Sequence, residues 1–320
     1  YNLPEKVLFC KKCVMSNQRP RIVFNEEGIC GACQWAEEKE NVVDWKERDR
    51  VFRDLLDKYR SKNGKYDVLV PCSGGKDSGS VAYKLKHEYD MNPLTVTWSP
   101  LLYAEIGFQN LQNMISSGLS NVLYTPNRLL QRKISKLGLV LIGNHFEAFG
   151  RGIQSYPIHV AIDLGIKLIM YGEQGELEYG GTHKNKDKPG PQFVNWDLVY
   201  HKGASSRELI EFGVENKYLD KDDLNDPSLK YFMLPPLEEI KKHGIDLHWF
   251  GYYNKWVPQE NYYYAAENYG FKPNPEGHSE GTYNKYASLD DHTDAMHYYL
   301  SLIKFGIGRA TSDAAHEIRE

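Results

Sequence analysis

The stretch that decides the fold is VLVPCSGGKDSGSVAYKL, residues 68–85. It opens with a short apolar run typical of a buried strand and closes with apolar residues at helical spacing. Between them stands S-G-G-K-D-S, which lacks the spacing of a Walker A loop. Gly74 and Gly75 can adopt backbone conformations that let N–H groups approach an anion, and the start of a helix adds partial positive charge. The stretch therefore predicts a phosphate-binding loop.

The side chains of this loop also suit a polyphosphate. Lys76 brings a positive charge, and Ser73 and Ser78 bring hydroxyl donors. Asp77 offers an oxygen ligand for the magnesium that accompanies such a group. The helix is expected to begin near Ser78. Because short glycine motifs are common, a plain glycine turn closed by a capping serine is the alternative.

Strands and helices alternate along the chain on both sides of this loop. A parallel sheet with crossover helices, an α/β fold, is the arrangement that such alternation predicts, with ligands bound at the carboxyl ends of the strands. An amphipathic helix at 44–64 is expected to lead into it. The expected strands are 67–72, 94–99, 121–126 and 166–172, and the expected helices of the sheet region are 78–89, 106–118 and 148–164.

Four of the five cysteines form two C-x-x-C pairs near the N-terminus, at Cys10, Cys13, Cys30 and Cys33. This spacing is typical of a structural zinc ribbon, whose four thiolates leave no open position on the metal. A redox pair is the alternative, which the duplication of the pair disfavours. The fifth cysteine, Cys72, is interpreted as a small buried residue at the end of a strand.

The rest of the chain offers weaker signals. Residues 182–206 are interpreted as a surface loop or lid, and the tyrosine-rich stretch 249–264 is either packing or a platform for sugar rings. Near the C-terminus, helical spacing puts three side chains on one face, which either contacts phosphates and a sugar nucleotide or forms an exposed, ion-paired stripe. They are Arg309, Asp313 and His316.

The motif SLDDHTD, residues 288–294, allows two interpretations. Asp291, His292 and Asp294 are residue types that bind metals. Ser288 followed by Asp291 is better interpreted as a capping box, the pattern that begins a helix.

Composition limits the classes of partner. The 320 residues carry a net charge of −4, and 41% are hydrophobic. No apolar run reaches the ~18 residues of a membrane helix, and an acidic balance disfavours a nucleic-acid partner. We expect a cytoplasmic protein that binds neither membrane nor nucleic acid. The sequence begins at Tyr1 and stops within a helical pattern that has no cap, which leaves a longer natural chain open.

The motif S-G-G-K-D-S after an apolar strand resembles the PP-loop of the N-type ATP pyrophosphatases, which have the adenine nucleotide alpha hydrolase-like fold. The resemblance implies ATP and Mg²⁺, with pyrophosphate held in the loop and adenine near Thr97 and Trp98. It also places Gly172 and Glu173, in YGEQGELEYGG, beside the nucleotide. Glu176 and Glu178 of the same stretch either take part or form a solvated acidic loop.

Taken together, CKKCVM, RPRIVFNEEGICGAC, SGGKDS, YGEQGELEYGG and GRATSDAAHEIR resemble the N-acetyl sugar amidotransferases, the WbpG/PseA-like family of surface-polysaccharide (lipopolysaccharide and O-antigen) biosynthesis. The resemblance covers essentially the whole chain. It implies an enzyme that uses ATP to turn the acetamido group of a sugar, nucleotide-linked in our expectation, into an acetamidino group.

For that reaction we expect Lys76, Asp77 and Glu173 to be the catalytic residues. Ammonia would come from a separate glutaminase subunit, because Tyr1 is no N-terminal nucleophile and Cys72 lies in the wrong loop. Zn²⁺ would be structural. The expected nucleotide-binding residues are Ser73, Gly74, Gly75, Lys76, Asp77, Ser78, Thr97, Trp98, Gly172 and Arg309.

The predicted organisation has four parts. They are a zinc ribbon (1–43), a linking helix (44–64), a PP-loop ATP-binding domain (65–215) and an irregular, aromatic-rich C-terminal region for substrate or partner packed on it (216–320). Three other functions stay open. One is a PP-loop enzyme that modifies tRNA, as in thiolation, although the acidic charge and the shortage of free cysteines disfavour it. The others are a non-catalytic ribbon module and a synthetase for a small acid or base.

Overall fold

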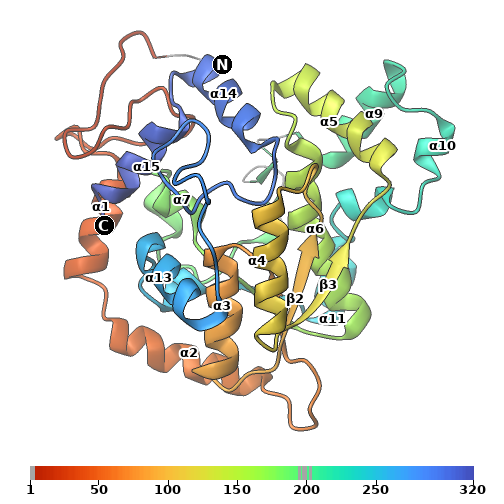
Figure 1. The fold of residues 1–320 in the computed structure, drawn as a ribbon, viewed down its shortest axis with the longest axis horizontal. Coiled ribbons are helices and arrows are strands. Elements are labelled where there is room, and N and C mark those ends of the chain that lie inside the picture. The colour runs from red at the N-terminus through yellow and green to blue at the C-terminus, as the bar shows by residue number, and fades with distance from the viewer. Residues whose placement is uncertain (1–3, 194–195, 197–199, 202–203) are drawn as a thin grey trace.

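A computed structural model describes residues 4–193, 196, 200–201 and 204–320 (Figure 1). Its centre is a five-stranded sheet in which every paired strand is parallel to its neighbour. The strand order is β3-β2-β1-β4-β5, so the chain adds strands on one side of β1 and then on the other. The strands are β1 (Val68–Pro71), β2 (Pro93–Trp98), β3 (Ser120–Tyr124), β4 (Leu168–Tyr171) and β5 (Asp246–Trp249).

The central strands are apolar on both faces because helices cover both faces. Val68 and Val70 of β1 point into one core, whereas Leu69 points into the other. β4 alternates in the same way, with Leu168 and Met170 opposite Ile169. The predicted parallel sheet with crossover helices is confirmed.

The helices that supply buried residues to the core beside Val68 and Val70 come from both halves of the chain. Phe52 of α2, for example, stacks on Tyr253 of α12 with ring centroids 4.7 Å apart. These helices are α2 (Trp45–Tyr59), α3 (Lys76–His87), α4 (Glu105–Ser116), α12 (Phe250–Tyr253) and α13 (Pro258–Tyr269).

The opposite core is built around Leu69 and Trp98. Figure 1 shows α5, α6, α9 and α10 gathered on this side of the strands. The elements here are α5 (Arg128–Ile142), α6 (Glu147–Leu164), α9 (Ser206–Glu215), α10 (Lys221–Leu224), η3 (Leu229–Phe232) and α11 (Leu237–His243).

The two ends of the chain meet over one end of the sheet. In Figure 1 the C-terminus lies beside α1, which leaves the cysteine cluster, and the Arg319 guanidinium is 3.9 Å from Cys13 Sγ. The elements of this region are α1 (Gly31–Asn41), α7 (Gly175–Glu178), η1 (His183–Asn185), α14 (Asp294–Phe305) and α15 (Arg309–Glu317).

The structure differs from the sequence predictions at several elements. α3 begins at Lys76 rather than near Ser78, and α5 and β5 were not predicted. In the described part of the cysteine ribbon, strand pairing is limited to the isolated bridges Phe9–Ser16 and Phe24–Cys30. Part of the predicted loop 182–206 lies outside the described residues, and the described part contains η1 and the start of α9.

The predicted capping box at Ser288 is wrong. The next helix, α14, begins at Asp294, and Ser288 has a positive φ of 56°. Asp291 instead accepts hydrogen bonds from the N–H groups of Leu101 and Thr293, 2.6 and 2.9 Å away, because its segment pairs with the chain after β2. No helix in the described part of the chain has the length and apolarity to cross a membrane.

Candidate functional site

The glycine loop lies where the strand order reverses. It follows β1, whose neighbours β2 and β4 lead the chain in opposite directions, and this is where open parallel sheets bind ligands. Gly74 has a φ of +89°, and a Cβ there would lie 2.5 Å from the Cα of Leu111. Glycine is therefore required by both conformation and space.

The loop ends in the first turn of α3, with Gly75 at the N-cap and no side chain capping the helix. The free N–H groups of this turn are those that the sequence predicts to bind an anion. From beneath, Tyr269 of α13 donates hydrogen bonds to the carbonyls of Gly75 and Lys76, at 3.3 and 3.1 Å. The loop of residues 73–78, called the cradle from here on, is thus fixed in place by a helix from the C-terminal third of the chain.

Lys76 and Asp77 are held within the cradle. Lys76 is buried, with 7% of the residue exposed. Its ammonium group forms an ion pair with Asp77 and lies 5.1 Å from the ring centroid of Tyr286. The other Asp77 oxygen accepts a hydrogen bond of 3.0 Å from the Asn261 amide. Both charged groups therefore have fixed positions before any ligand arrives.

A cavity of about 990 Å³ opens beside the cradle. Its wall includes the loop, the turn after β4, the segment between the cysteine pairs, the helices α14 and α15, and residues near Trp256 and Tyr286. The cavity brings together predicted site residues from distant parts of the chain. Those on its wall include Lys76, Asp77, Glu173, Arg309, Asp313 and His316.

Glu173 follows β4 and lies near Asp77. Burial raises the pKa of the Glu173 carboxyl, and the negative charge of Asp77 raises it further. Tyr179 donates a hydrogen bond of 3.2 Å to this carboxylate. Asp77 and Glu173 present two carboxylates to the same cavity, and carboxylate oxygens are ligands that Mg²⁺ prefers, so the residues fit the expected Mg²⁺.

A smaller cavity of about 190 Å³ lies directly against the loop. Ser73, Gly74, Gly75 and Arg309 line it, together with Asp290, which the sequence did not single out. Burial raises the pKa of the Asp290 carboxyl to about 6, with Asp294 adding to the effect. An acid that is difficult to ionise therefore lies next to the phosphate cradle.

Helix α15 turns its predicted face toward the large cavity. Arg309 Nε is 3.3 Å from Asp313, and Arg309 also donates to the Tyr298 hydroxyl. Burial lowers the pKa of His316 to about 3, and the nearby cations of Arg319, Arg19, Lys39 and Lys76 contribute. The three residues are thus ion-paired in part, but they face a cavity and do not form an exposed stripe.

The structure does not bring the side chains of Thr97 and Trp98 to this cavity. The Thr97 hydroxyl donates to the Cys72 carbonyl at 2.6 Å, and Trp98 is 3% exposed in the core with its ring against Gly152. Contact between adenine and β2 stays a prediction, and only the backbone of Thr97 and Trp98 could make it. Gly172 accepts a backbone hydrogen bond from Gly251 and lies close to Trp256.

The acidic turn after β4 is not solvated at Glu178. Its carboxylate accepts hydrogen bonds from Trp35 Nε1 and from Lys39 Nζ, both at 2.8 Å. Glu176 pairs with Arg21 at 3.1 Å. The alternative of a solvated acidic loop is therefore wrong for Glu178, because its carboxylate is buried and paired. Both of its partners lie on α1, far away in the sequence.

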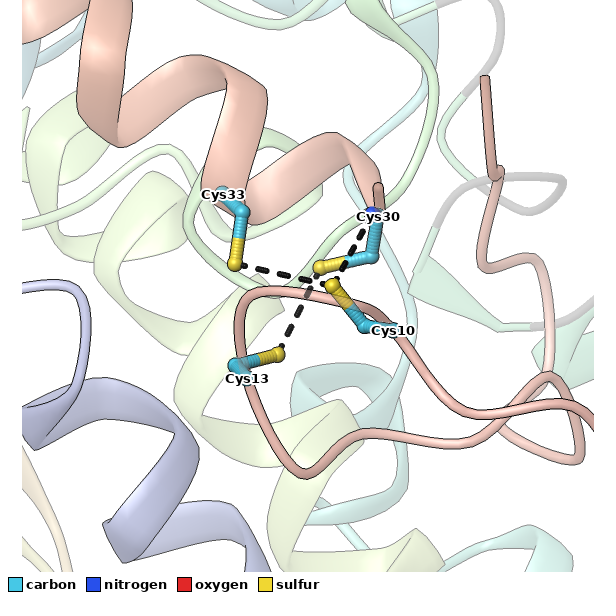
Figure 2. Close-up of side chains that lie close together, drawn as sticks. All are labelled: Cys10, Cys13, Cys30 and Cys33. Atoms are coloured by element: carbon cyan, nitrogen blue, oxygen red, sulfur yellow. Dashed lines mark hydrogen bonds between the residues drawn. The ribbon is translucent and has the colours of Figure 1, made fainter. Parts of the chain in front are cut away.

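The four paired cysteines converge on one point. Figure 2 shows their sulfur atoms turned toward one another, Cys30 and Cys33 at the start of α1 and Cys10 and Cys13 on a preceding loop. The Cys10–Cys33 and Cys13–Cys30 sulfur separations are 3.8 and 3.7 Å. A tetrahedron with Zn–S bonds of about 2.3 Å has edges of about 3.8 Å, so the donor set fits Zn²⁺.

Cys72 is separate from this cluster. It is buried, its thiol lies 3.1 Å from Met114 Sδ, and burial raises its pKa to about 11. The interpretation as a small buried residue is confirmed. Such a thiol is poorly suited to nucleophilic chemistry, which acts through the thiolate.

Most of the tyrosine-rich stretch serves packing. Tyr253 and Tyr262 are buried in the core, and Tyr262 stacks on Tyr286 at 4.8 Å. Among the described residues, the four cysteines form the only group of three or more His, Cys, Asp or Glu arranged for a metal, so Asp291, His292 and Asp294 form no such group. Arg19 also lines the cavity; it begins the motif RPRIVFNEEGICGAC, but no role was predicted for it.

No protein-family model matches the chain, and no curated protein matches its sequence. Solved structures that are similar over about two thirds of the chain include two synthetases. One is an NH3-dependent NAD synthetase from Campylobacter jejuni subsp. jejuni NCTC 11168 in complex with the nitrate ion, with 16% identity, 64% of this chain and 98% of that chain covered, and a TM-score of 0.33. The other is NMN synthetase from Francisella tularensis, with 13% identity, 63% and 93% covered, and a TM-score of 0.30. Both are remote in sequence and backbone path, so the function of this chain rests on its own residues.

Proposed function

We propose that this protein is an ATP-dependent, AMP-forming amidotransferase that converts the acetamido group of a sugar into an acetamidino group. The observation that carries the proposal is the S-G-G-K-D-S cradle on the wall of a cavity of about 990 Å³. A nucleotide in the cradle and an acceptor in the cavity would be neighbours. The resemblance to the N-acetyl sugar amidotransferases supplies the identity of the acceptor.

In the first step, the amide oxygen of the acceptor attacks the α-phosphorus of ATP. The bond to the bridging oxygen breaks, and pyrophosphate leaves from the cradle. Lys76 and the free N–H groups at the start of α3 stabilise the charge on the departing group. Asp77 and Glu173 would hold Mg²⁺, which neutralises phosphate charge when bound.

In the second step, ammonia adds to the imidoyl carbon of the adenylated acceptor. The carbon–oxygen bond breaks, AMP leaves with the electron pair, and the nitrogen releases a proton. The site must exclude water, which would otherwise hydrolyse the activated acceptor. Positioning and charge stabilisation therefore account for catalysis without a dedicated acid or base.

Ammonia would come from a separate glutaminase subunit. The cysteine outside the metal cluster, Cys72, is buried with a raised pKa, which makes it unsuited to attack glutamine. The same property disfavours a sulfur relay of the kind found in tRNA thiolation. Surface-polysaccharide synthesis is the context that the resemblance implies.

The test is to incubate the protein with ATP, Mg²⁺ and an ammonium salt, adding acetamido sugars linked to UDP or CMP one at a time. We expect AMP and pyrophosphate in equal amounts, with a fall in sugar mass equal to the replacement of O by NH. AMP without a changed sugar would refute the proposed acceptor and redirect the search to others, tRNA included. No AMP with any acceptor would refute the use of ATP.

A further inference from the structure

The segment between the two cysteine pairs reaches into the large cavity. Arg19, Pro20 and Arg21 line it, and they also line an adjoining cavity of about 300 Å³. The cysteine ribbon is therefore part of the cavity wall as well as a folding unit at the N-terminus.

This segment is held in a defined shape. Arg21 has a positive φ of 64°, which is uncommon for a residue other than glycine, and its side chain pairs with Glu176 at 3.1 Å. The N–H of Val23 donates to the Gly180 carbonyl at 3.1 Å. The turn after β4 thus fixes the ribbon segment that carries Arg19.

Arg19 differs from three of the cations around it. Lys76, Lys39 and Arg309 form ion pairs with Asp77, Glu178 and Asp313. No carboxylate in the described part of the chain forms an ion pair with Arg19, whose guanidinium lies 5.4 Å from the ring centroid of Tyr179. Burial lowers the pKa of Arg19, and the charge of Arg319 also lowers it. A desolvated arginine without a counter-ion is suited to bind an anion.

The positive charges near Arg19 also act on the side chain of His316. The positive charges of Arg319, Arg19, Lys39 and Lys76 all lower the pKa of His316, after burial as the largest cause. Positive charges therefore gather around His316, although acidic side chains also line the cavity and the chain as a whole carries a net charge of −4. Such a local field favours an anionic ligand.

The location of Arg19 separates this anion from the triphosphate of ATP. Arg309 lines the small cavity against Ser73, Gly74 and Gly75, whereas Arg19 does not. Arg19 lies instead in the large cavity, whose walls include the rings of Tyr179, Tyr298 and Trp256. Aromatic walls with an arginine are suited to a sugar that carries a phosphate.

We propose that the zinc ribbon is the acceptor-recognition element of this protein, and that Arg19 binds a phosphate group attached to the acetamido sugar. The proposal rests on the proposed function for the identity of the sugar. The chemistry that recognises the ligand is a bidentate contact between guanidinium and phosphate, which both a sugar 1-phosphate and a nucleotide-linked sugar can make.

The experiment measures binding by isothermal titration calorimetry with the cradle saturated by α,β-methylene-ATP and Mg²⁺. The probes are N-acetylglucosamine, its 1-phosphate and UDP-N-acetylglucosamine. We expect the unmodified protein to bind the phosphate-bearing probes more tightly than the neutral sugar. Equal affinity for the two phosphate-bearing probes would indicate that phosphate alone is recognised, and tighter binding of the UDP sugar would indicate a nucleotide carrier.

Arg19→Gln should weaken binding of the phosphate-bearing probes at least tenfold, with ATP affinity changed less than twofold. Arg19→Lys keeps the charge but loses the planar fork. Its affinity for the phosphate-bearing probes should lie between those of the unmodified protein and Arg19→Gln. The matched control is Lys12→Gln, which removes one charge from an exposed part of the ribbon. It should bind like the unmodified protein. Circular dichroism and zinc content establish that each variant is folded.

Three results would overturn the proposal. They are no preference of the unmodified protein for phosphate-bearing probes, unchanged affinity in Arg19→Gln, or an equal loss of ATP affinity in that variant. AMP formation with an acceptor sugar, measured on the unmodified protein, tests the proposed function separately. AMP formation with unchanged binding in Arg19→Gln would overturn only the inference, whereas selective loss of phosphate binding without AMP formation would overturn only the function.

Discussion

The ammonium group of Lys39 lies 2.8 Å from the carboxylate of Glu178, and each side chain is only 10% exposed. Lys39 is on α1, which leaves the cysteine cluster, and Glu178 is on the turn that carries Glu173 into the cavity. Trp35 of α1 donates to the same carboxylate. The buried ion pair between Lys39 and Glu178 therefore joins the cysteine ribbon to the edge of the candidate active site.

Replacing Lys39 with methionine should destabilise the protein by about 3 kcal/mol, since it leaves the Glu178 carboxylate buried without its cation. Urea unfolding monitored by circular dichroism would measure the change. The control is Arg50→Met, which breaks an exposed pair with Glu47 and Asp54 and should cost about 0–1 kcal/mol. Equal effects in the two variants would show that the buried pair has no special role.

Lys76→Ala should abolish AMP formation and leave the fold intact. The side chain supplies the positive charge of the cradle, but its removal leaves the sheet and the backbone N–H groups in place. AMP release and the thermal midpoint would be measured on the same preparation. Lys62→Ala, on the exposed loop before β1, is the control for a lost lysine and should retain full activity. Full activity in Lys76→Ala would contradict the assignment of the loop.

Cys30→Ser should release zinc and destabilise the ribbon, because three thiolates cannot complete the tetrahedron. Metal content by mass spectrometry should fall from one zinc per chain in the unmodified protein to nearly none. Cys72→Ala removes a cysteine outside the cluster, so its zinc content should stay unchanged. A Cys30→Ser protein that keeps its zinc would refute the metal site.

The features that the sequence predicted are those encoded by neighbouring residues. The cradle lies within Ser73–Ser78, and each cysteine pair is a C-x-x-C unit, so local spacing was sufficient to find them. The strands β1, β2 and β4 were also recognisable, because burial on both faces makes them predominantly apolar runs, with two threonines in β2.

The features that it missed depend on contacts between distant segments. β5 is a short edge strand of mixed polarity, DLHW, whose pairing with β4 cannot be inferred from local pattern. Glu178 is indistinguishable from a solvated acid until Lys39 is placed beside it. Asp290 and Arg19 reach the site only because the two ends of the chain fold over the same edge of the sheet.

The two glycines of the cradle should respond differently to alanine. Gly74→Ala would force an unfavourable φ of +89° and place Cβ 2.5 Å from the Leu111 backbone, so we expect a loss of about 2–3 kcal/mol. Gly75 has a φ of −68°, and its Cβ would lie 3.2 Å from the Ser73 hydroxyl alone, so Gly75→Ala should cost less than about 1 kcal/mol. Thermal and urea unfolding would compare them, and equal losses would contradict the described loop conformation.

The stability of the fold should depend on pH through Asp290. Burial raises the pKa of this carboxyl from 3.8 to about 6. The folded state therefore binds a proton that the unfolded state has already released in this range. The stabilisation is complete below pH 3.8 and is lost as the pH rises to about 6. A shift of about two pKa units corresponds to at most about 3 kcal/mol.

Asp290→Asn should remove the free-energy cost of burying this carboxylate in its ionised form. We expect the variant to be more stable than the unmodified protein at pH 7.5 and similar to it near pH 4, where the native carboxyl is protonated in the fold.

Asp290→Asn should also bind ATP more tightly at pH 7.5, because a carboxylate beside Ser73 repels phosphate. Asp294 and Asp291 add negative charge around Asp290, and Arg309 lines the same cavity, so the experiment needs a fixed ionic strength. Urea unfolding across pH and ATP titration provide the two measurements, with exposed Asp222→Asn as the control for a lost charge. Weaker ATP binding in Asp290→Asn would show that the carboxylate helps to hold the nucleotide and would contradict this prediction.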